Sequence, residues 1–98
     1  MEIEYDNDKA IKNIQKHGIA FAEAKQLWSG LSVEVSASSE NEPRWLQIGK
    51  IRGKFYTCVF TRRRHAVRLI SLRRSRKKEE DIYHEKASKE KDDYSQRI

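Results

Sequence analysis

The sequence has few of the residues that cross-link or anchor a chain. It contains one cysteine, Cys58, which excludes an intramolecular disulfide and a cysteine-based metal cluster. Cys58 lies in the apolar stretch FYTCVF and is expected in the core. No apolar run is long enough to cross a bilayer, and the start MEIEYDNDKA lacks the layout of a secretory signal. We therefore expect a cytoplasmic protein.

Patterns that bind common cofactors are also missing. The sequence has no glycine-rich phosphate loop and no His/Asp spacing typical of a metal site, so we predict no cofactor and no metal. Its 98 residues leave room for one modest core. We predict a single domain over residues 1–98, with a core over 1–85 and a charged C-terminal tail over 86–98 that frays.

Acidic residues are absent from residues 62–78, RRRHAVRLISLRRSRKK, which hold nine basic side chains. Residues 1–61 carry eight basic and eight acidic residues, and residues 79–98 carry four basic and seven acidic ones. The net charge of +6 therefore comes from this basic band. Such a concentration of charge attracts polyanions, most often nucleic acid phosphates, although many charge runs are solvated surface.

The basic band is not a disordered tail, because its centre, AVRLISL, is rich in the β-branched and aliphatic residues of a strand. Alternation and β-formers predict further strands upstream. We expect strands at residues 31–36, 44–50, 55–61 and 66–72, joined by a polar loop at 36–43, a turn at Arg52-Gly53 and the four-residue turn RRRH at 62–65.

The first third of the chain has helical periodicity. Asp6 or Asn7 is a candidate cap for a helix that ends at Gly18, with an apolar stripe of Ala10, Ile11 and Ile14. A second stripe consists of Phe21, Ala24, Leu27 and Trp28 and stops at Gly30. MEIEY is expected as an edge strand, and Ser75 as the cap of a last helix over 76–83. The order β-α-α-β-β-β-β-α predicts an α+β protein with helices packed on a small antiparallel sheet.

Three blocks of the sequence resemble the BrnT family of toxins from bacterial type II toxin–antitoxin pairs. They are DNDKAxxNxxKHGIxFxEA at 6–24, ExRW at 42–45, and TxR with RLISLRRxxKKExxxY at 61–83. The blocks occur in order and at similar spacing. Two positions depart from the family pattern: Tyr5 stands where a tryptophan is usual, and Arg76 stands where Ser or Thr often caps the last helix.

The resemblance implies a RelE-like ribonuclease that cuts RNA and inhibits translation in the bacterial cytoplasm. It also implies a cognate BrnA-like antitoxin with a ribbon-helix-helix part, which binds operator DNA. Toxin and antitoxin would form a heterotetramer that represses its own operon, so the toxin would reach operator DNA only through the antitoxin. No membrane is involved.

Metal-independent RNA cleavage needs a base for the 2′-OH, cations on the phosphorane and an acid for the leaving oxygen. By match to the family blocks, we expect Arg73 and Arg74, with Arg63, to stabilise the phosphate. Glu79 and Tyr83, on one face of the last helix, complete the expected catalytic residues. The basic band and the ExRW block supply candidate RNA-binding residues, namely Arg44, Trp45, Arg62, Arg68, Arg76, Lys77 and Lys78. For Arg68, mid-strand, a carboxylate partner and a ligand are equally compatible with the sequence. Trp45 also fits a core position.

The base is open between three side chains. Glu79 lies among cations that keep it ionised, which suits holding an arginine better than accepting a proton. Tyr83, four residues later on the same face, is a candidate proton donor or stacking group. His17 is the alternative base by its ordinary pKa, but it also fits a structural role at the end of a helix.

Two other functions use the same basic band. A non-catalytic RNA-binding or ribosome-associated module would contact phosphates, show a steep salt dependence and cut nothing. A cationic groove is also a docking surface for an acidic or strand-forming protein segment. Cleavage by purified protein in EDTA, lost on substitution of Arg73, discriminates the first alternative from the nuclease.

Overall fold

The computed structural model describes residues 2–37 and 41–96, with side chains through residue 88. Its elements are β1 (Glu2–Glu4), α1 (Asn7–His17), the short 3-10 helix η1 (Phe21–Ala24), α2 (Lys25–Ser29), β2 (Ser32–Ala37), β3 (Arg44–Ile51), β4 (Lys54–Arg63), β5 (Ala66–Arg74) and α3 (Lys77–Gln96). This order confirms the α+β class. Part of the predicted loop 36–43, at residues 38–40, lies outside the described residues.

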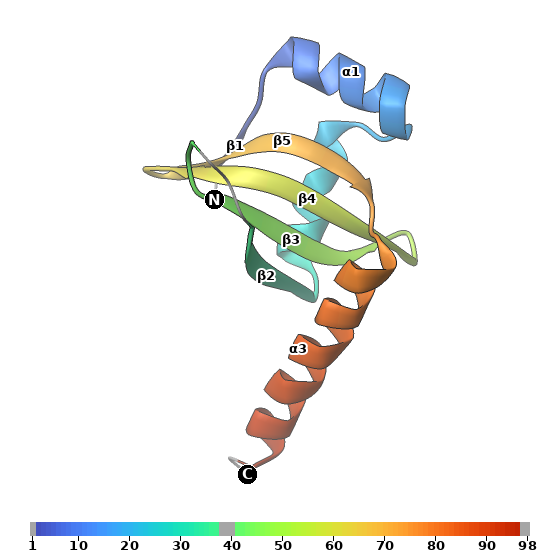
Figure 1. Ribbon diagram of the computed structural model, residues 1–98, viewed down its shortest axis with the longest axis vertical. Coiled ribbons are helices and arrows are strands. Elements are labelled where there is room, and N and C mark those ends of the chain that lie inside the picture. The colour runs from blue at the N-terminus through green and yellow to red at the C-terminus, as the bar shows by residue number, and fades with distance from the viewer. Residues whose placement is uncertain (1, 38–40, 97–98) are drawn as a thin grey trace.

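The strands form one sheet in the order β1-β5-β4-β3-β2 (Figure 1). Strands β2 to β5 make an antiparallel meander, as the sequence predicts. One detail differs: β1 pairs with β5 in parallel, so the sheet is mixed. The meander leaves β5 with a free edge, and β1 covers that edge only from Ala66 to Arg68. The rest of this edge is therefore available to another element.

The two turns of the meander have different forms. The turn between β3 and β4 is at Arg52 and Gly53, which both have positive φ, as a type I′ turn requires. Between β4 and β5 the turn consists of Arg64 and His65 alone. The predicted four-residue turn is therefore wrong, because the strand pairing continues through Arg63 and Ala66.

The two faces of the sheet carry separate apolar clusters. On one face, Phe21, Leu27 and neighbouring residues of η1 and α2 pack against Phe60 and Leu69. Trp28 packs edge-to-face on Phe60 with ring centroids 5.1 Å apart. The predicted stripe of the second helical segment is confirmed, and Cys58 is buried in the same cluster. Burial raises the pKa of its thiol to about 12.

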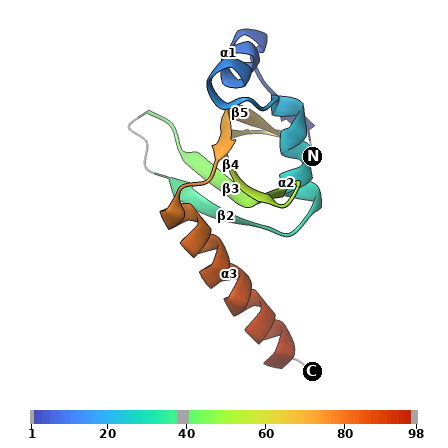
Figure 2. The ribbon, with the colours of Figure 1, turned by 90° about the vertical axis from the view of Figure 1, so that its right-hand side faces the viewer.

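On the opposite face, α3 covers the sheet over β2 and β3 (Figure 2). Its Tyr83 packs with Val33 and Ile48, and the ring of Phe55 lies edge-to-face on Tyr83. The helix begins at Lys77 and continues to Gln96, well past the expected 76–83, and its far end projects from the sheet (Figure 1). None of the helices within the described residues is long and apolar enough to span a membrane.

The first helix docks differently from the prediction. Asp6 caps it by accepting a hydrogen bond from the Asp8 N–H, and Gly18 ends it in the left-handed conformation. The predicted apolar stripe is only partly confirmed: Ala10 packs against the core, but Ile11 and Ile14 are about half exposed, at 55% and 49%. The face turned to the sheet instead carries Asn13, which is 6% exposed. A polar side chain therefore holds α1 in place.

Asn13 binds the free edge of β5 as a strand would. Its amide oxygen accepts from the Leu72 N–H at 3.1 Å, and its amide nitrogen donates to the Leu72 carbonyl at 2.8 Å. The same nitrogen donates to the Ile19 carbonyl at 3.0 Å, beyond the end of the helix. Asn13 thus satisfies three backbone groups, two of them on the part of β5 that β1 leaves uncovered.

We predict that Asn13→Ala destabilises the fold by about 2–4 kcal/mol, because buried backbone groups lose their partners. Urea unfolding followed by circular dichroism measures the change. Asn7→Ala, at the exposed first position of α1, is the matched control and should stay within about 0.5 kcal/mol of the wild type. Equal stability of the two variants would show that the Asn13 hydrogen bonds contribute little.

Candidate functional site

An arginine–carboxylate pair joins the end of β5 to the first turn of α3. The Arg73 guanidinium donates from Nη1 to Oε1 and from Nη2 to Oε2 of Glu79, both at 2.8 Å. The two side chains are only 16% and 8% exposed. This fork geometry holds the arginine plane in one orientation and gives the pair more weight than a surface ion pair.

Glu79 also accepts hydrogen bonds from two other groups. The Arg76 N–H, at the position before α3, donates to Oε1 at 2.8 Å, and the Thr57 hydroxyl donates to the same oxygen at 3.0 Å. Glu79 thereby supplies the glutamate half of a capping box. The prediction that Ser75 caps the helix is wrong: its hydroxyl is hydrogen-bonded to that of Thr57 at 2.8 Å.

These contacts decide the protonation state of the pair. Burial raises the pKa of Glu79, but the hydrogen bonds and charge of Arg73, with the Arg76 N–H and the Thr57 hydroxyl, outweigh it and lower the pKa to about 2. The hydrogen bond to Glu79 in turn raises the pKa of Arg73. At neutral pH the carboxylate is therefore ionised and a poor base, whereas its hold on Arg73 is firm.

His17 is the last residue of α1 and is half-buried. Burial lowers the pKa of its imidazole, and the positive charges of Lys16 and Arg73 lower it further. The ring is therefore neutral at pH 7 and able to accept a proton. The charge of Arg73 thus acts on His17, which links the end of α1 to the end of β5 electrostatically.

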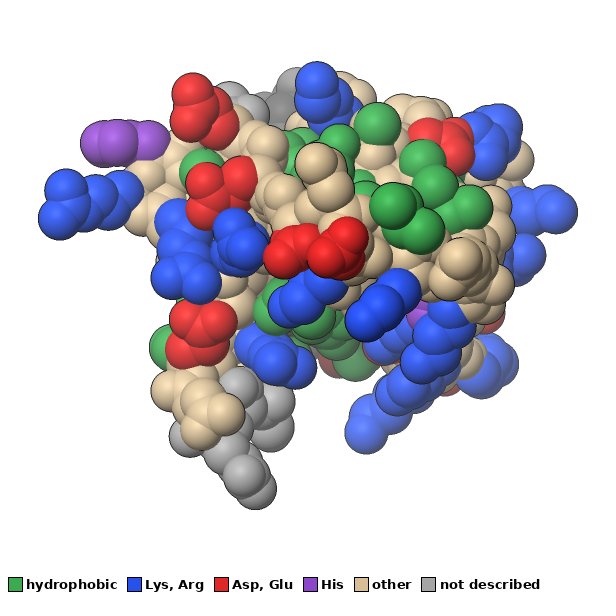
Figure 3. All heavy atoms as spheres, turned by 90° about the horizontal axis from the view of Figure 1, so that it is seen from above, with side chains coloured by type: hydrophobic (Ala, Val, Ile, Leu, Met, Phe, Trp, Pro, Cys, Tyr) green, Lys and Arg blue, Asp and Glu red, His purple; other side chains and the backbone are tan. Residues whose placement is uncertain are grey.

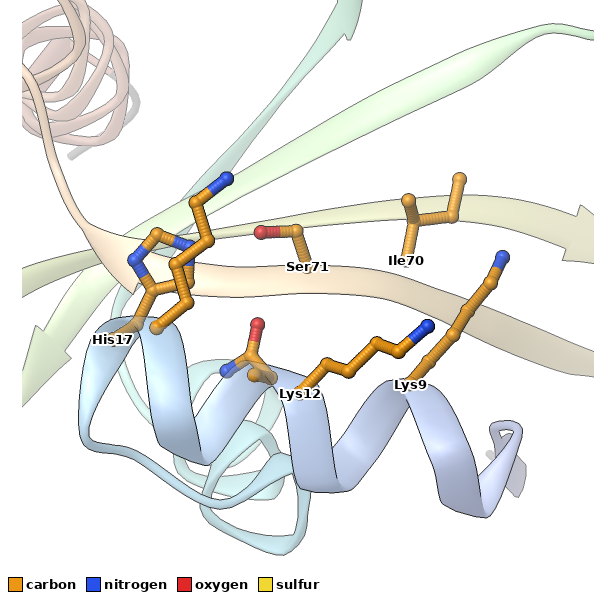
Figure 4. Close-up of a pocket in the computed structure, with 7 residues that line it drawn as sticks. Lys9, Lys12, His17, Ile70 and Ser71 are labelled. Carbon is orange, nitrogen blue, oxygen red and sulfur yellow. The ribbon is translucent and has the colours of Figure 1, made fainter.

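A cavity of about 240 Å³ lies beside His17, between α1 and β5 (Figure 4). The side chains of Lys9 and Lys12 rise from α1 on the side of β5, as Figure 4 shows. We call this cavity the α1 lysine pocket; it is lined by Lys9, Lys12, Asn13, Lys16, His17, Ile70 and Ser71. Basic side chains crowd the lower right of Figure 3, whereas at its left they alternate with acidic ones.

The structure does not bring the three predicted phosphate-binding arginines together. Arg74 follows Arg73 on β5, so its side chain points to the opposite face of the sheet, where its guanidinium lies 5.6 Å from the centre of the Tyr56 ring. Arg63 is at the other end of the β4–β5 hairpin, 3.8 Å from Glu42. Of the three, Arg73 alone contributes to the lowered pKa of His17.

The hairpin end of the basic band is largely engaged within the protein. Arg62 is bonded to Glu34, and its guanidinium stacks on Trp45 with 4.8 Å to the ring centre. Trp45 is half-buried against the core, which agrees with its alternative as a core residue. Arg68, on the middle of β5, is 3.9 Å from Glu4 and remains partly exposed. Arg44 is exposed at the start of β3.

The remaining predicted residues lie on α3 or just before it. Arg76, Lys77 and Lys78 are exposed, and Lys77 pairs with Asp81 at 2.7 Å. The Tyr83 ring, in contrast, is buried, at 7% exposure, within the apolar cluster under α3. The structure thus surrounds the Arg73–Glu79 pair with cations but packs Tyr83 into the core.

Sequence reasoning did not select the lysines of α1 as site residues. Their spacing, three and then four residues apart, places Lys9, Lys12 and Lys16 on one face and was visible in the sequence. What was not visible is that Asn13 turns this face toward β5. Ser71, on β5, was missed for the same reason.

The fold and this site define a small α+β protein that presents a fixed arginine, a neutral histidine and a cationic pocket side by side, a combination suited to phosphate groups. Among the described residues, no group of three or more His, Cys, Asp or Glu could hold a metal ion. A family model described as "Ribonuclease toxin, BrnT, of type II toxin-antitoxin system" matches residues 5–79. The chain belongs to this family of ribonuclease toxins, which implies a cognate antitoxin.

A solved structure agrees with this assignment. The crystal structure of the Brucella abortus ribonuclease toxin BrnT, at 1.1 Å resolution, is similar with a TM-score of 0.62 and 25% sequence identity. The similarity covers 79% of this chain and 99% of the Brucella chain. No curated protein sequence matches the chain.

We predict that Glu79 stabilises the fold in a pH-dependent way. Its folded-state pKa is depressed, so this stabilisation is present above the ordinary carboxyl value of 4.5 and is lost as the pH falls toward about 2. In urea unfolding from pH 7 to pH 2, Glu79→Gln should be less stable at pH 7 and show a shallower decline than the wild type. Glu80→Gln is the control; a wild-type pH dependence in Glu79→Gln would contradict the assignment.

Proposed function

We propose that the chain is a metal-independent endoribonuclease in which His17 and Arg73 act on one phosphodiester. The observation that carries the proposal is a neutral imidazole that lines a cationic pocket, within electrostatic reach of a guanidinium held in place by Glu79. Attack of a 2′-OH on its own phosphate needs a base and a cation, and these two side chains have the matching protonation states.

In the proposed reaction, the neutral imidazole of His17 takes the proton of the 2′-OH as its oxygen attacks the phosphorus. The negative charge that grows on the phosphorane oxygens is met by Arg73. Its Nε–H and one Nη2–H have no partner among the described residues and are available for two phosphate oxygens. The 5′-oxygen leaves with a proton from solvent, and the product ends in a 2′,3′-cyclic phosphate.

Glu79 has a different role in this proposal from the general base that the sequence suggested as one option. With its pKa near 2 it holds Arg73 in place and accepts no proton, which makes it a positioning residue. Tyr83 supports the packing of α3. A wider electrostatic surface attracts the RNA. It consists of the exposed Arg76, Lys77 and Lys78, together with Arg68 and the arginines at the β4–β5 turn, Arg62, Arg63 and Arg64.

We further propose the biological setting that the family resemblance implies. Cleavage removes RNA needed for translation and stops growth in the bacterial cytoplasm. The cognate antitoxin is BrnA-like, carries a ribbon-helix-helix part that binds operator DNA, and forms with this chain a heterotetramer that represses the operon.

Cleavage of total RNA by purified protein in EDTA tests the catalytic proposal. We expect fragments with cyclic phosphate ends from the wild type and a loss of about 10²–10³-fold in rate for Arg73→Lys, which keeps the charge but not the fork. For the wild type, the rate should fall as the pH drops below the ordinary histidine pKa of 6.5, because the base becomes protonated. His17→Gln should lose this acidic limb.

Arg64→Gln, at the hairpin turn, is the control and should keep the wild-type pH profile. Tight RNA binding by folded wild type without any cleavage would favour the non-catalytic binding module instead. Cleavage that requires added divalent metal would contradict the metal-independent mechanism.

The antitoxin proposal is tested by expression in a host that lacks the partner. We expect growth arrest and fragmented RNA on induction of the wild type, and neither with Arg73→Ala at equal soluble expression. Co-expression with the small ribbon-helix-helix protein of the same operon should restore growth and yield a complex whose mass fits two copies of each chain. A monomeric toxin recovered alone from such cells would contradict the heterotetramer.

A further inference from the structure

The α1 lysine pocket is the feature that the proposed reaction leaves unused, apart from His17 at its rim. Its wall on the α1 side carries the ammonium groups of Lys9, Lys12 and Lys16, and its lining includes no carboxylate. Among the described residues, none of the three lysines forms an ion pair within 4 Å. The cavity therefore concentrates positive charge that the protein itself does not neutralise.

The second basic cavity of the molecule differs in this respect. It lies at the β4–β5 turn and is lined by Arg62, Arg63, Arg64 and His65, with parts of β5. Two of its arginines are already engaged, Arg62 by Glu34 and Arg63 by Glu42. The charge of the hairpin cavity is thus partly met within the fold, so an external anion gains more at the α1 lysine pocket.

The lysine arrangement costs the fold stability. Like charges one turn apart on a helix repel, and Lys9 also lies in the first turn of α1, where the helix dipole disfavours a cation. No packing role offsets this cost, since Lys9, Lys12 and Lys16 are all exposed. A ligand of opposite charge would offset it.

The β5 side of the pocket offers a neutral donor. The half-buried hydroxyl of Ser71 has no hydrogen-bond partner among the described residues and is able to donate to an anion. Asn13, in contrast, has its amide committed to Leu72 and Ile19, so it serves as the rigid floor. Flexible ammonium groups and one hydroxyl on a fixed floor suit a phosphate group, which carries several acceptor oxygens.

We propose that the α1 lysine pocket binds a second RNA phosphate, the one next to the phosphate that is cut. The inference rests on the proposed ribonuclease function and deepens it. Ser71 lines the pocket and Arg73 lies two residues further along β5 on the same face, so a strand with its scissile phosphate at Arg73 passes into the pocket at the neighbouring position. The lysines then contribute to substrate binding, whereas Arg73 acts on the reacting phosphate.

The test uses a probe that the protein cannot cut, a 2′-O-methyl RNA dodecamer of randomised sequence, which lacks the attacking hydroxyl. Fluorescence anisotropy between 50 and 200 mM salt gives the dissociation constant and its salt dependence for the full chain. We expect Lys9→Gln/Lys12→Gln to bind about tenfold more weakly and to lower the salt slope by about 0.7, the value for one lost phosphate contact on a single strand.

The charge-matched control is Lys25→Gln/Lys54→Gln, two exposed lysines outside the pocket, which should bind the dodecamer within about twofold of the wild type. In cleavage of natural RNA, Lys9→Gln/Lys12→Gln should raise KM and leave kcat within about twofold, a split that a general loss of folding would not produce.

Three results would overturn the inference. If the wild type cuts RNA and the pocket variant matches the control in affinity, slope and KM, the pocket holds no phosphate although the ribonuclease proposal stands. If the pocket variant loses antitoxin binding but not RNA binding, the pocket serves the protein partner. If the wild type neither binds nor cuts RNA, the ribonuclease proposal and the phosphate subsite both fail.

Discussion

The hydrogen bonds between the Asn13 amide and the backbone of Leu72 fix the geometry of the site. Apolar burial would have rotated α1 to bring Ile11 and Ile14 onto the sheet, and a rotation of that kind moves the lysine face away from β5. The amide prevents this because it must meet one N–H and one carbonyl of an uncovered strand edge at 3.1 and 2.8 Å. His17, one turn later on the same helix, is thereby held at the α1 lysine pocket, within electrostatic reach of Arg73. The position of the proposed base thus depends on an amide that takes no part in the chemistry.

The alternation of side chains along β5 explains how one basic band serves separate purposes. Arg73 faces Glu79 and Thr57, whereas the next residue, Arg74, lies against Tyr56 on the opposite face. At the hairpin end, carboxylates of β2 and the following loop meet Arg62 and Arg63. These two charges are met locally, whereas the α1 lysines, which lie outside the band and adjoin it at Ile70 and Ser71, form no ion pair among the described residues.

The structural features that depend on local residue patterns were predicted correctly from the sequence. The strands of the meander, the glycine at the end of α1 and the buried stripe of Phe21, Ala24 and Leu27 all follow from periodicity and turn residues, and all are observed.

The errors arose where one tertiary contact overrides the pattern. Ile11 and Ile14 form a good stripe, yet three buried hydrogen bonds of Asn13 outweigh it. Serine is a residue type that often caps helices, but the Ser75 hydroxyl is hydrogen-bonded to the hydroxyl of Thr57, eighteen residues away. A linear pattern also cannot show that Arg73 acts on the pKa of His17 from a distant segment.

The same charges that hold Arg73 in place also prepare His17. Glu79, with a pKa of about 2, stays ionised at any pH at which the fold is expected to function, so the pair it forms with Arg73 does not titrate near neutrality. The Glu79 carboxylate accepts hydrogen bonds from Arg73, Arg76 and Thr57, and the positive charge of Arg73 lowers the pKa of the His17 imidazole.

A permanent positive charge near a base lowers the pKa of the base and so weakens it as a proton acceptor. Here burial and charge keep the imidazole neutral, and neutrality is the state that proton transfer from a 2′-OH requires. Arg73 carries the permanent charge and His17 is the group that titrates. A change in pH near neutrality therefore alters the protonation of His17 and leaves the charge of Arg73 unchanged.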